Sequence, residues 1–263
     1  MKKLRLESKD APLLKALYRF VPSLRGASDR ALSVYMPARR EGFDLRHYDI
    51  EIGQLRRRYM DRLDDEAREI MERELMRLRD HLVIVKPAGC PSIAGFSDEP
   101  VGLLELVNLP QEVEARLEVG PLLLAPIERL IEKSPPALVV VVDKEEGKLL
   151  AAVLDEVYPI AHIKGVEVKH SKAGGTSAQS NQRKADNRTK ANMERVLQAV
   201  EREVKTGEFG RLFVGGTQEA RAELERLMPP AVKKLLAGHV PASLQSTRLQ
   251  HDLREQLILT RTS

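Results

Sequence analysis

The sequence contains no tryptophan, and aromatic residues make up only 4% of its 263 positions. Proteins that hold single-stranded nucleic acid by base stacking use aromatic side chains as platforms. Stacking is therefore not expected to be the main mode of binding here. Cysteine is also scarce, because Cys90 is alone. A single thiol excludes an internal disulfide and favours a reducing, cytoplasmic location.

Long apolar runs are lacking as well. The longest, such as residues 137–142, fall far short of the about 20 residues that a membrane-spanning helix needs. The start of the chain, residues 1–7, lacks the apolar centre of a signal peptide. The six histidines are scattered without the spacing of a metal site. We therefore expect no membrane partner, no metal and no cofactor.

The chain is rich in charged residues, and its excess of positive charge is concentrated in one segment. The formal net charge is +4 with a pI near 9.1. Residues 164–195 alone carry eight Lys and Arg against three Asp and Glu, so the remainder is close to neutral. The cations are Lys164, Lys169, Lys172, Arg183, Lys184, Arg188, Lys190 and Arg195. Such a concentration favours an anionic partner that is bound through its phosphates.

The first half of the chain predicts an α+β domain over residues 1–120. Residues 32–36 resemble a strand, and residues 83–118 alternate short apolar stretches with turn residues, which is typical of several strands. Between them, apolar residues from Ile52 to Leu82 recur at steps of mostly three and four. This spacing predicts a long amphipathic helix, or two helices that divide near Asp64.

The second half predicts a mixed-sheet domain over residues 121–240, followed by a C-terminal helix within residues 241–263. Its pattern of strand, hairpin, strand, loop, helix, strand and helix makes the chain as a whole an α/β protein. The expected elements are strands at 138–142, 149–154 and 212–214, a strand that continues toward Ile160, helices at 181–205, 218–228 and 244–259, and a short helix that ends at Gly238.

A diglycine, Gly174-Gly175, precedes the helix predicted at 181–205. Adjacent glycines allow positive φ and close approach of the backbone to a partner. The second half of that helix has an apolar face, whereas Gln182–Lys190 contains only Ala185 as an apolar residue. The first half is therefore expected to project into solvent or into a partner, with its cations on one broad face.

This loop resembles the catalytic loop of the archaeal and eukaryotic class I peptide release factors and of their bacterial relatives. Those proteins carry a basic pair, then Gly-Gly-Gln-Ser-Ala, then an arginine-rich helix. Lys169-His170, Gly174-Gly175 and Ser177-Ala178 match this order, and Thr176 stands where the family has its glutamine. Related quality-control peptidyl-tRNA hydrolases place a glutamine slightly later, where Gln179 or Gln182 lies here.

The resemblance implies a ribonuclease-H-like second domain with a projecting loop and helix, and a ribosome-associated peptidyl-tRNA hydrolase that acts in rescue of stalled chains. Its partners would be the large ribosomal subunit, ribosomal RNA and peptidyl-tRNA. The implied catalytic residues are Gly174, Gly175, Thr176, Gln179 and Gln182. The implied RNA-binding residues are Lys169, His170, Lys172, Arg183, Lys184, Arg188 and Lys190. The third domain that binds a GTPase in such factors is not expected, which places a GTPase partner in doubt.

Three other interpretations remain open from the sequence. Because Thr176 replaces the glutamine, the protein could bind the ribosome or its RNA without hydrolysis, or act as an RNA-binding scaffold. A metal-dependent nuclease is disfavoured, because Asp143 and Asp155 flank the hairpin without a carboxylate cluster.

A second diglycine, Gly215-Gly216, lacks surrounding positive charge and is interpreted as a packing turn with Thr217 as a helix cap.

Overall fold

The computed structural model describes residues 14–168 and 176–261, and for residues 176–179 and 258–261 it describes the backbone alone. The chain forms two compact units that divide between Ser134 and Pro135. The functional boundaries predicted near residues 120 and 240 stay predictions, because compactness alone does not define a functional domain. Each unit contains helices and a sheet, so the predicted α/β class is confirmed.

The first unit is built on a four-stranded antiparallel sheet with the order β3-β2-β1-β4. Its strands are β1 (Ala31–Pro37), β2 (Ser92–Asp98), β3 (Leu103–Leu109) and β4 (Arg116–Gly120). This confirms the predicted strand near residues 32–36 and the strands expected within 83–118.

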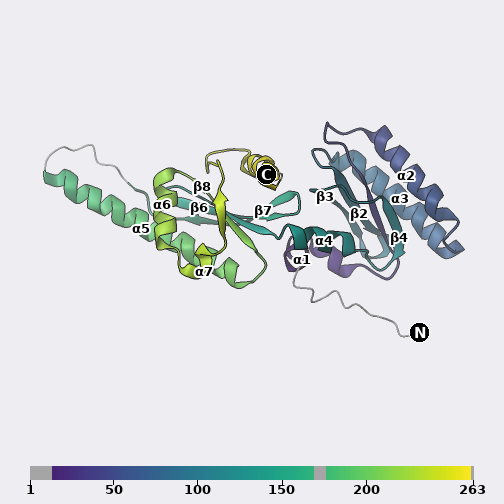
Figure 1. Ribbon diagram of the computed structural model, residues 1–263, viewed down its shortest axis with the longest axis horizontal. Helices are drawn as coiled ribbons and strands as arrows, with labels where there is room; N and C mark the ends of the chain where they lie inside the picture. The colour runs from purple at the N-terminus through teal and green to yellow at the C-terminus, as the bar shows by residue number, and fades with distance from the viewer. Residues whose placement is uncertain (1–13, 169–175, 262–263) are drawn as a thin grey trace. The chain divides into compact units, whose positions relative to one another are not determined.

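Two antiparallel helices, α2 (Leu45–Met60) and α3 (Asp65–Val85), pack on one face of this sheet (Figure 1). They divide where the sequence predicted, because the Asp64 carboxylate accepts a hydrogen bond from the amide of Ala67 and caps α3. Apolar side chains of both helices and of β1 form one core beneath them. The lone Cys90 lies buried in that core, and its Sγ donates to Asn108 Oδ1 at 3.3 Å.

Short elements complete the first unit. They are α1 (Lys15–Phe20), α4 (Ala125–Lys133) and the 3₁₀ turns η3 (Pro22–Gly26) and η4 (Glu99–Val101). The segment that enters α4 is bonded to β1, because the Ser33 hydroxyl accepts from the amide of Leu123 and the Tyr35 hydroxyl donates to its carbonyl. Side chains alternate along a strand, so these residues lie on the sheet face opposite to α2 and α3.

A carboxylate is fully buried between α3 and β2. Glu74 accepts hydrogen bonds from Ser97 Oγ at 2.6 Å, from Arg77 at 2.7 Å and from Arg73 at 3.1 Å. Burial alone would raise the pKa of Glu74, but these hydrogen bonds together with one from the amide of Glu99 hold it below its ordinary value. Glu74 thus compensates two arginines at the sheet surface.

Replacing Glu74 with alanine is expected to lower the free energy of unfolding of the first unit by about 3–5 kcal/mol, because Arg77 would lose its buried partner. The control is Glu72→Ala, which removes an exposed carboxylate of the same helix that pairs with Arg56. That loss should stay below about 1 kcal/mol. Urea unfolding measures both, and equal losses would contradict the role given to Glu74.

The contribution of Glu74 to stability has a predicted pH dependence. A carboxylate with a lowered pKa in the folded state stabilises the protein above its unfolded-state pKa, and this contribution disappears as the pH falls through the folded-state value. The difference in unfolding free energy between the wild type and Glu74→Gln should therefore shrink in acid.

The second unit is built on a mixed five-stranded sheet with the order β7-β6-β5-β8-β9. Three strands, β5 (Ala137–Val142), β6 (Glu146–Val153) and β7 (Glu156–Lys164), form an antiparallel meander. The other two, β8 (Arg211–Gly216) and β9 (Leu236–His239), add in parallel beyond β5. The meander and the parallel strand β8 were predicted, and β9 is an additional strand that the sequence analysis did not predict.

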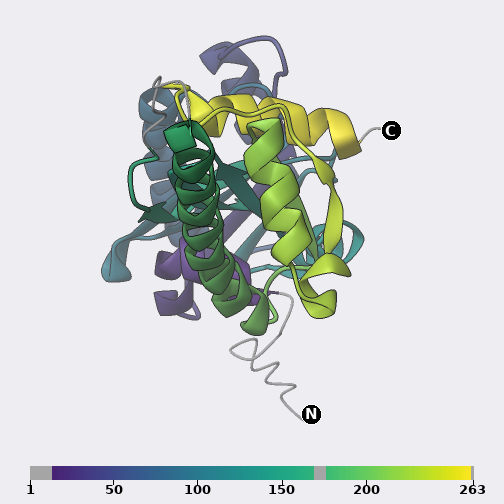
Figure 2. The ribbon, with the colours of Figure 1, turned by 90° about the vertical axis from the view of Figure 1, so that its left-hand side faces the viewer.

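Helices cover both faces of this sheet. The long α5 (Thr176–Lys205) and α6 (Gln218–Leu227) lie side by side on one face (Figure 2). The other face packs against α8 (Leu249–Arg261), whose Leu249, Leu253 and Leu257 join the core of β5 and β6. An ion pair between Arg254 and Asp155, at 2.9 Å, fastens α8 to the turn between β6 and β7.

Three predicted boundaries in this unit are wrong. α5 begins at Thr176 and not at Asn181, because residues 176–180 have only Ala178 as an apolar residue, and one residue shows no periodicity. The short helix that was predicted to end at Gly238 ends earlier, because α7 covers only Pro230–Lys233. The edge strand β9 (Leu236–His239) takes the place of its predicted last residues. The terminal helix starts at Leu249 and not at Leu244, because a turn in which Ser246 Oγ donates to Asp252 precedes it.

Candidate functional site

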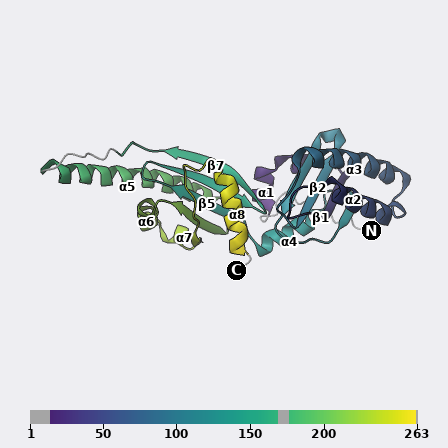
Figure 3. The same ribbon diagram turned by 90° about the horizontal axis from the view of Figure 1, so that it is seen from above.

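The first half of α5 forms an arm, defined here as residues 176–191, that extends beyond the strands of its own unit (Figure 3). From Ser180 to Ala191, Ala185 is the one buried residue of the described side chains. At 1.5 Å per residue the arm reaches about 24 Å from Asn192 to Thr176. The structure thus confirms that this half projects, as its lack of apolar residues predicted.

The arm presents cations to solvent. Arg183, Lys184, Arg188 and Lys190 are all exposed. Lys190 lies 3.8 Å from Glu194, and Arg188 donates to the carbonyl oxygen of Glu167 at 3.2 Å. The one acidic residue of the arm, Asp186, accepts a hydrogen bond from the Gln182 side chain at 2.8 Å. The four predicted RNA-binding residues of the helix therefore form an accessible positive surface.

Two of the predicted catalytic residues, Thr176 and Gln179, lie at the tip of the arm. Thr176 is the first residue of α5, and Gln179 lies in its first turn. Gln182 follows on the exposed surface, with its side-chain amide donated to Asp186. Gly174 and Gly175, together with Lys169, His170 and Lys172, lie outside the described residues.

The start of α5 has chemistry of its own. The first four amides of an α-helix have no partner within the helix, and the helix dipole makes this end positive. In α5 these amides belong to residues that directly follow the diglycine. Donors of this kind stabilise negative charge on an oxygen atom.

The sequence analysis missed the residues at the base of the arm. Asn192 is buried, and its side chain bonds the backbone of Lys144 and Val166. Nearby, the amide of Val168 donates to Glu145 Oε1 at 2.8 Å. These partners are distant along the chain, so periodicity could not reveal them. The available signal was the position of Asn192, directly before the apolar face of the helix.

The second diglycine makes a tight crossing between β8 and β5. Gly216 has φ +108°, and a Cβ atom at this position would overlap the carbonyl oxygen of Val142. The amide of Thr217 donates to that same oxygen at 3.1 Å. The packing-turn interpretation is therefore confirmed. Thr217 is the N-cap residue of α6, as predicted, but its side chain makes no capping hydrogen bond.

The carboxylates of the second unit have structural partners. Asp143 accepts hydrogen bonds from the amides of Glu145 and Glu146 and shapes the turn after β5, and Asp155 pairs with Arg254. Strand β5 itself consists of Ala, Leu and Val. Within residues 14–168 and 176–261, no group of three His, Cys, Asp or Glu is placed to hold a metal.

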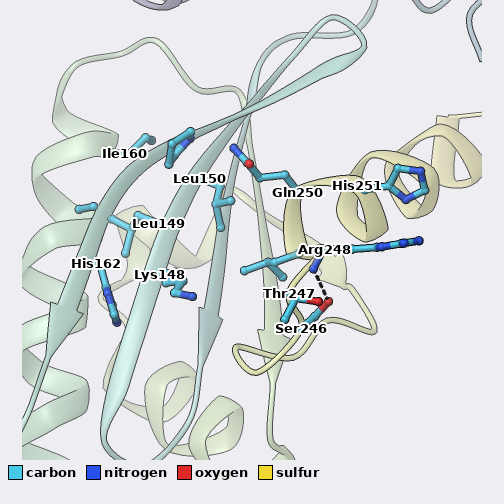
Figure 4. Close-up of a pocket in the computed structure, with 13 residues that line it drawn as sticks. Lys148, Leu149, Leu150, Ile160, His162, Ser246, Thr247, Arg248, Gln250 and His251 are labelled. Atoms are coloured by element: carbon cyan, nitrogen blue, oxygen red, sulfur yellow. Dashed lines mark hydrogen bonds between the residues drawn. The ribbon is translucent and has the colours of Figure 1, made fainter. Parts of the chain in front are cut away.

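A cavity of about 890 Å³ lies between β6, β7 and the start of α8 (Figure 4). Its ionisable residues do not converge on one point. Lys148 Nζ donates to the carbonyl oxygen of Leu244, and His162 lies 2.7 Å from Glu146. Arg248 and His251 extend away from the strands in Figure 4. The cavity therefore does not assemble a nucleophile with a base.

None of the helices in the part of the chain that the structure describes is both long and apolar enough to cross a bilayer.

The second unit combines a ribonuclease-H-like sheet with a long helix, α5, whose first half is a cationic arm that directly follows a diglycine. These features define a release-factor-like protein. The family model of the bacterial archaeo-eukaryotic release factor family 10 matches residues 123–258, which is more than half of the chain. The chain therefore belongs to this family. No curated protein matches it at a significant level.

Solved structures of translation factors resemble the chain weakly. The archaeal translation termination factor aRF1 is 16% identical, with 92% of this chain and 70% of that chain covered and a TM-score of 0.35. The Pelota protein of Thermoplasma acidophilum is 10% identical, with 65% of this chain and 49% of that chain covered and a TM-score of 0.33. Dom34 of S. cerevisiae, a translation termination-like factor, is 8% identical, with 65% of this chain and 56% of that chain covered and a TM-score of 0.29. Because these values are low, the family assignment rests on the family model.

Proposed function

We propose that this protein is a cytoplasmic, ribosome-associated peptidyl-tRNA hydrolase that releases nascent chains from stalled large subunits. The observation that carries the proposal is the exposed cationic arm, whose helix begins immediately after Gly174-Gly175. Membership of a release-factor family supports the same assignment. In this function the cations of the arm contact ribosomal RNA, and its tip enters the peptidyl-transferase centre.

The chemistry required of the tip is modest. The ester that joins the peptide to the tRNA is already reactive, so a positioned water and stabilisation of the developing oxyanion suffice. The amides at the start of α5, which have no partner within the helix, are suitable oxyanion donors. The side-chain oxygen of Gln179 or Gln182 would orient the water, in place of the glutamine that Thr176 replaces.

A second candidate is a ribosome-binding factor without hydrolytic activity. It is favoured by Thr176, which occupies the first position of α5 where the family motif has glutamine. Incubation of the protein with large subunits that carry labelled peptidyl-tRNA separates the two. Released peptide supports the hydrolase, and tight binding without release supports the second candidate.

Reversing the charge of the arm should abolish most ribosome binding. Arg183→Glu, Lys184→Glu and Arg188→Glu together are expected to weaken co-sedimentation with large subunits about 10- to 100-fold, because each phosphate contact contributes a salt-dependent share of the affinity. The wild type should lose affinity steeply as salt increases, and the variant should lose it less steeply.

The matched control for this variant changes the same net charge elsewhere in the same unit. Arg202, Lys205 and Lys233 are exposed cations outside the arm, and their reversal to Glu should leave binding within about threefold of the wild type. Equal weakening by both triple variants would show that only the net charge matters, and unchanged binding by the arm variant would remove the arm from the proposed function.

A further inference from the structure

Asn192 is a buried polar residue at the base of the arm. It is 1% exposed, and the residue after it, Met193, is the first of the apolar side chains that dock the second half of α5. Residues 186–191, just before it, have no buried side chain. Asn192 therefore lies where the helix leaves the body of its unit.

The Asn192 side chain bonds three backbone groups from two other segments. Its Oδ1 accepts from the amide of Val166 at 2.8 Å. Its Nδ2 donates to the carbonyl oxygens of Val166 at 2.8 Å and of Lys144 at 3.0 Å. An amide side chain that bonds both the N–H and the C=O of one residue replaces the pair of backbone hydrogen bonds that a neighbouring β-strand would make. The chain that leaves β7 is thus held directly to α5.

This junction is closely packed. A Cβ atom at Gly165 would overlap the Asn192 side chain and the carbonyl oxygen of Glu145. The amide of Gly165 donates to that same carbonyl at 2.7 Å, and Glu145 Oε1 accepts from the amide of Val168. We call Asn192, Gly165 and Glu145 the clamp. It joins the turn after β5, the chain that leaves β7, and α5.

Beyond the clamp, the chain follows the helix toward its tip. Arg188 donates to the carbonyl oxygen of Glu167, and both Val168 and Ala185 are buried. Residues 165–168 and α5 are the two segments between which residues 169–175 run. The clamp therefore fixes the chain that enters that segment, residues 165–168, against the base of α5.

We propose that Asn192 is a positioning residue for peptide release. Because the arm reaches about 24 Å past the clamp, a change of about 2–3° at its base moves the tip by roughly 1 Å. A displacement of that size at a reacting centre can cost up to about 100-fold in rate. This consequence for catalysis rests on the proposed hydrolase function, whereas the clamp itself does not.

The test uses Asn192→Ala, with Gln198→Ala as the matched control, because Gln198 is an exposed amide side chain of the same helix outside the arm. Three quantities are measured on the full chain: amide hydrogen exchange at Val166 and Val168, binding to large subunits, and peptide release per bound factor. Asn192→Ala is expected to speed exchange about tenfold or more, to slow release about 10- to 100-fold, and to leave binding to the subunits within about twofold. Gln198→Ala should change none of these.

Two results would overturn the inference. Unchanged exchange at Val166 in Asn192→Ala would show that the clamp does not hold the chain, whatever the wild type does on the ribosome. Faster exchange with full release per bound factor would show that the clamp is structural and does not position the tip. If the wild type itself releases no peptide, the proposed hydrolase fails while the exchange result still decides the clamp.

A second variant protects the test against misfolding of Asn192→Ala. Glu145 lies on the surface of the turn after β5, so Glu145→Ala removes the acceptor of the Val168 amide without opening the core. It is expected to speed exchange at Val168 and to slow release in the same direction as Asn192→Ala. Normal exchange at Val168 in this variant would count against the clamp.

Discussion

Gly175→Ala is expected to bind large ribosomal subunits as tightly as the wild type and to release peptide about 100-fold more slowly. A methyl group at this position would restrict positive φ and hinder close approach to the ester, and it would displace the donors at the start of α5. Losing one oxyanion donor in an enzyme typically costs about 100- to 1,000-fold in rate. Single-turnover release from pre-bound subunits measures the effect separately from binding.

The same assay decides which polar side chain assists the backbone. If the water is held by backbone groups, Thr176→Ala, Gln179→Ala and Gln182→Ala should each cost much less than Gly175→Ala. If one glutamine has replaced the family residue, its variant alone should approach the loss at Gly175. The control is Gly53→Ala, in the middle of α2, where a Cβ atom meets open space. Full release by a normally folded Gly175→Ala protein would remove this loop from catalysis.

The largest loss of stability is expected for Gly216→Ala. The new methyl group would overlap the carbonyl oxygen of Val142, at a backbone φ of +108°. Relieving that overlap requires β5 and β8 to separate at the point where the amide of Thr217 is bonded. We expect destabilisation of more than about 4 kcal/mol, enough to remove most soluble protein.

A second glycine separates the two causes of this loss. Gly207 also has positive φ, +71°, but a Cβ atom there would meet nothing within 4 Å. Gly207→Ala should therefore show the conformational penalty alone, about 1–2 kcal/mol. Thermal unfolding of both variants provides the comparison, and similar losses would mean that overlap with Val142 is relieved at little cost.

Local pattern was sufficient to predict the features that depend on solvent exposure. The projection of the arm follows from residues 182–190, which offer Ala185 as the one apolar side chain and so cannot dock. The mixed sheet follows from short apolar runs separated by turns. The division of α2 from α3 follows from Asp64, because its carboxylate satisfies the first amides of α3.

The features that sequence reasoning missed depend on partners distant in the chain. Asn192 bonds residues 48 and 26 positions away, and Glu74 bonds Ser97 across the packing of α3 on β2. Neither pairing leaves a periodic signal. β9 was mistaken for helix because a four-residue edge strand is too short to show alternation. The first turn of α5 was missed because residues 176–180 have only Ala178 as an apolar residue and so form no apolar face.

Because Cys90 is buried, cysteines introduced in the arm can be labelled selectively. The native thiol has no exposed surface and is bonded to Asn108 in the core of the first unit, so maleimide reagents should react slowly with it in the folded protein. Cysteines introduced one at a time at exposed positions such as Ser180 or Asn187 can therefore be modified in the otherwise native sequence. Attached fluorophores or photocrosslinkers would then report where each part of the arm contacts its partner, without first removing a side chain from the core.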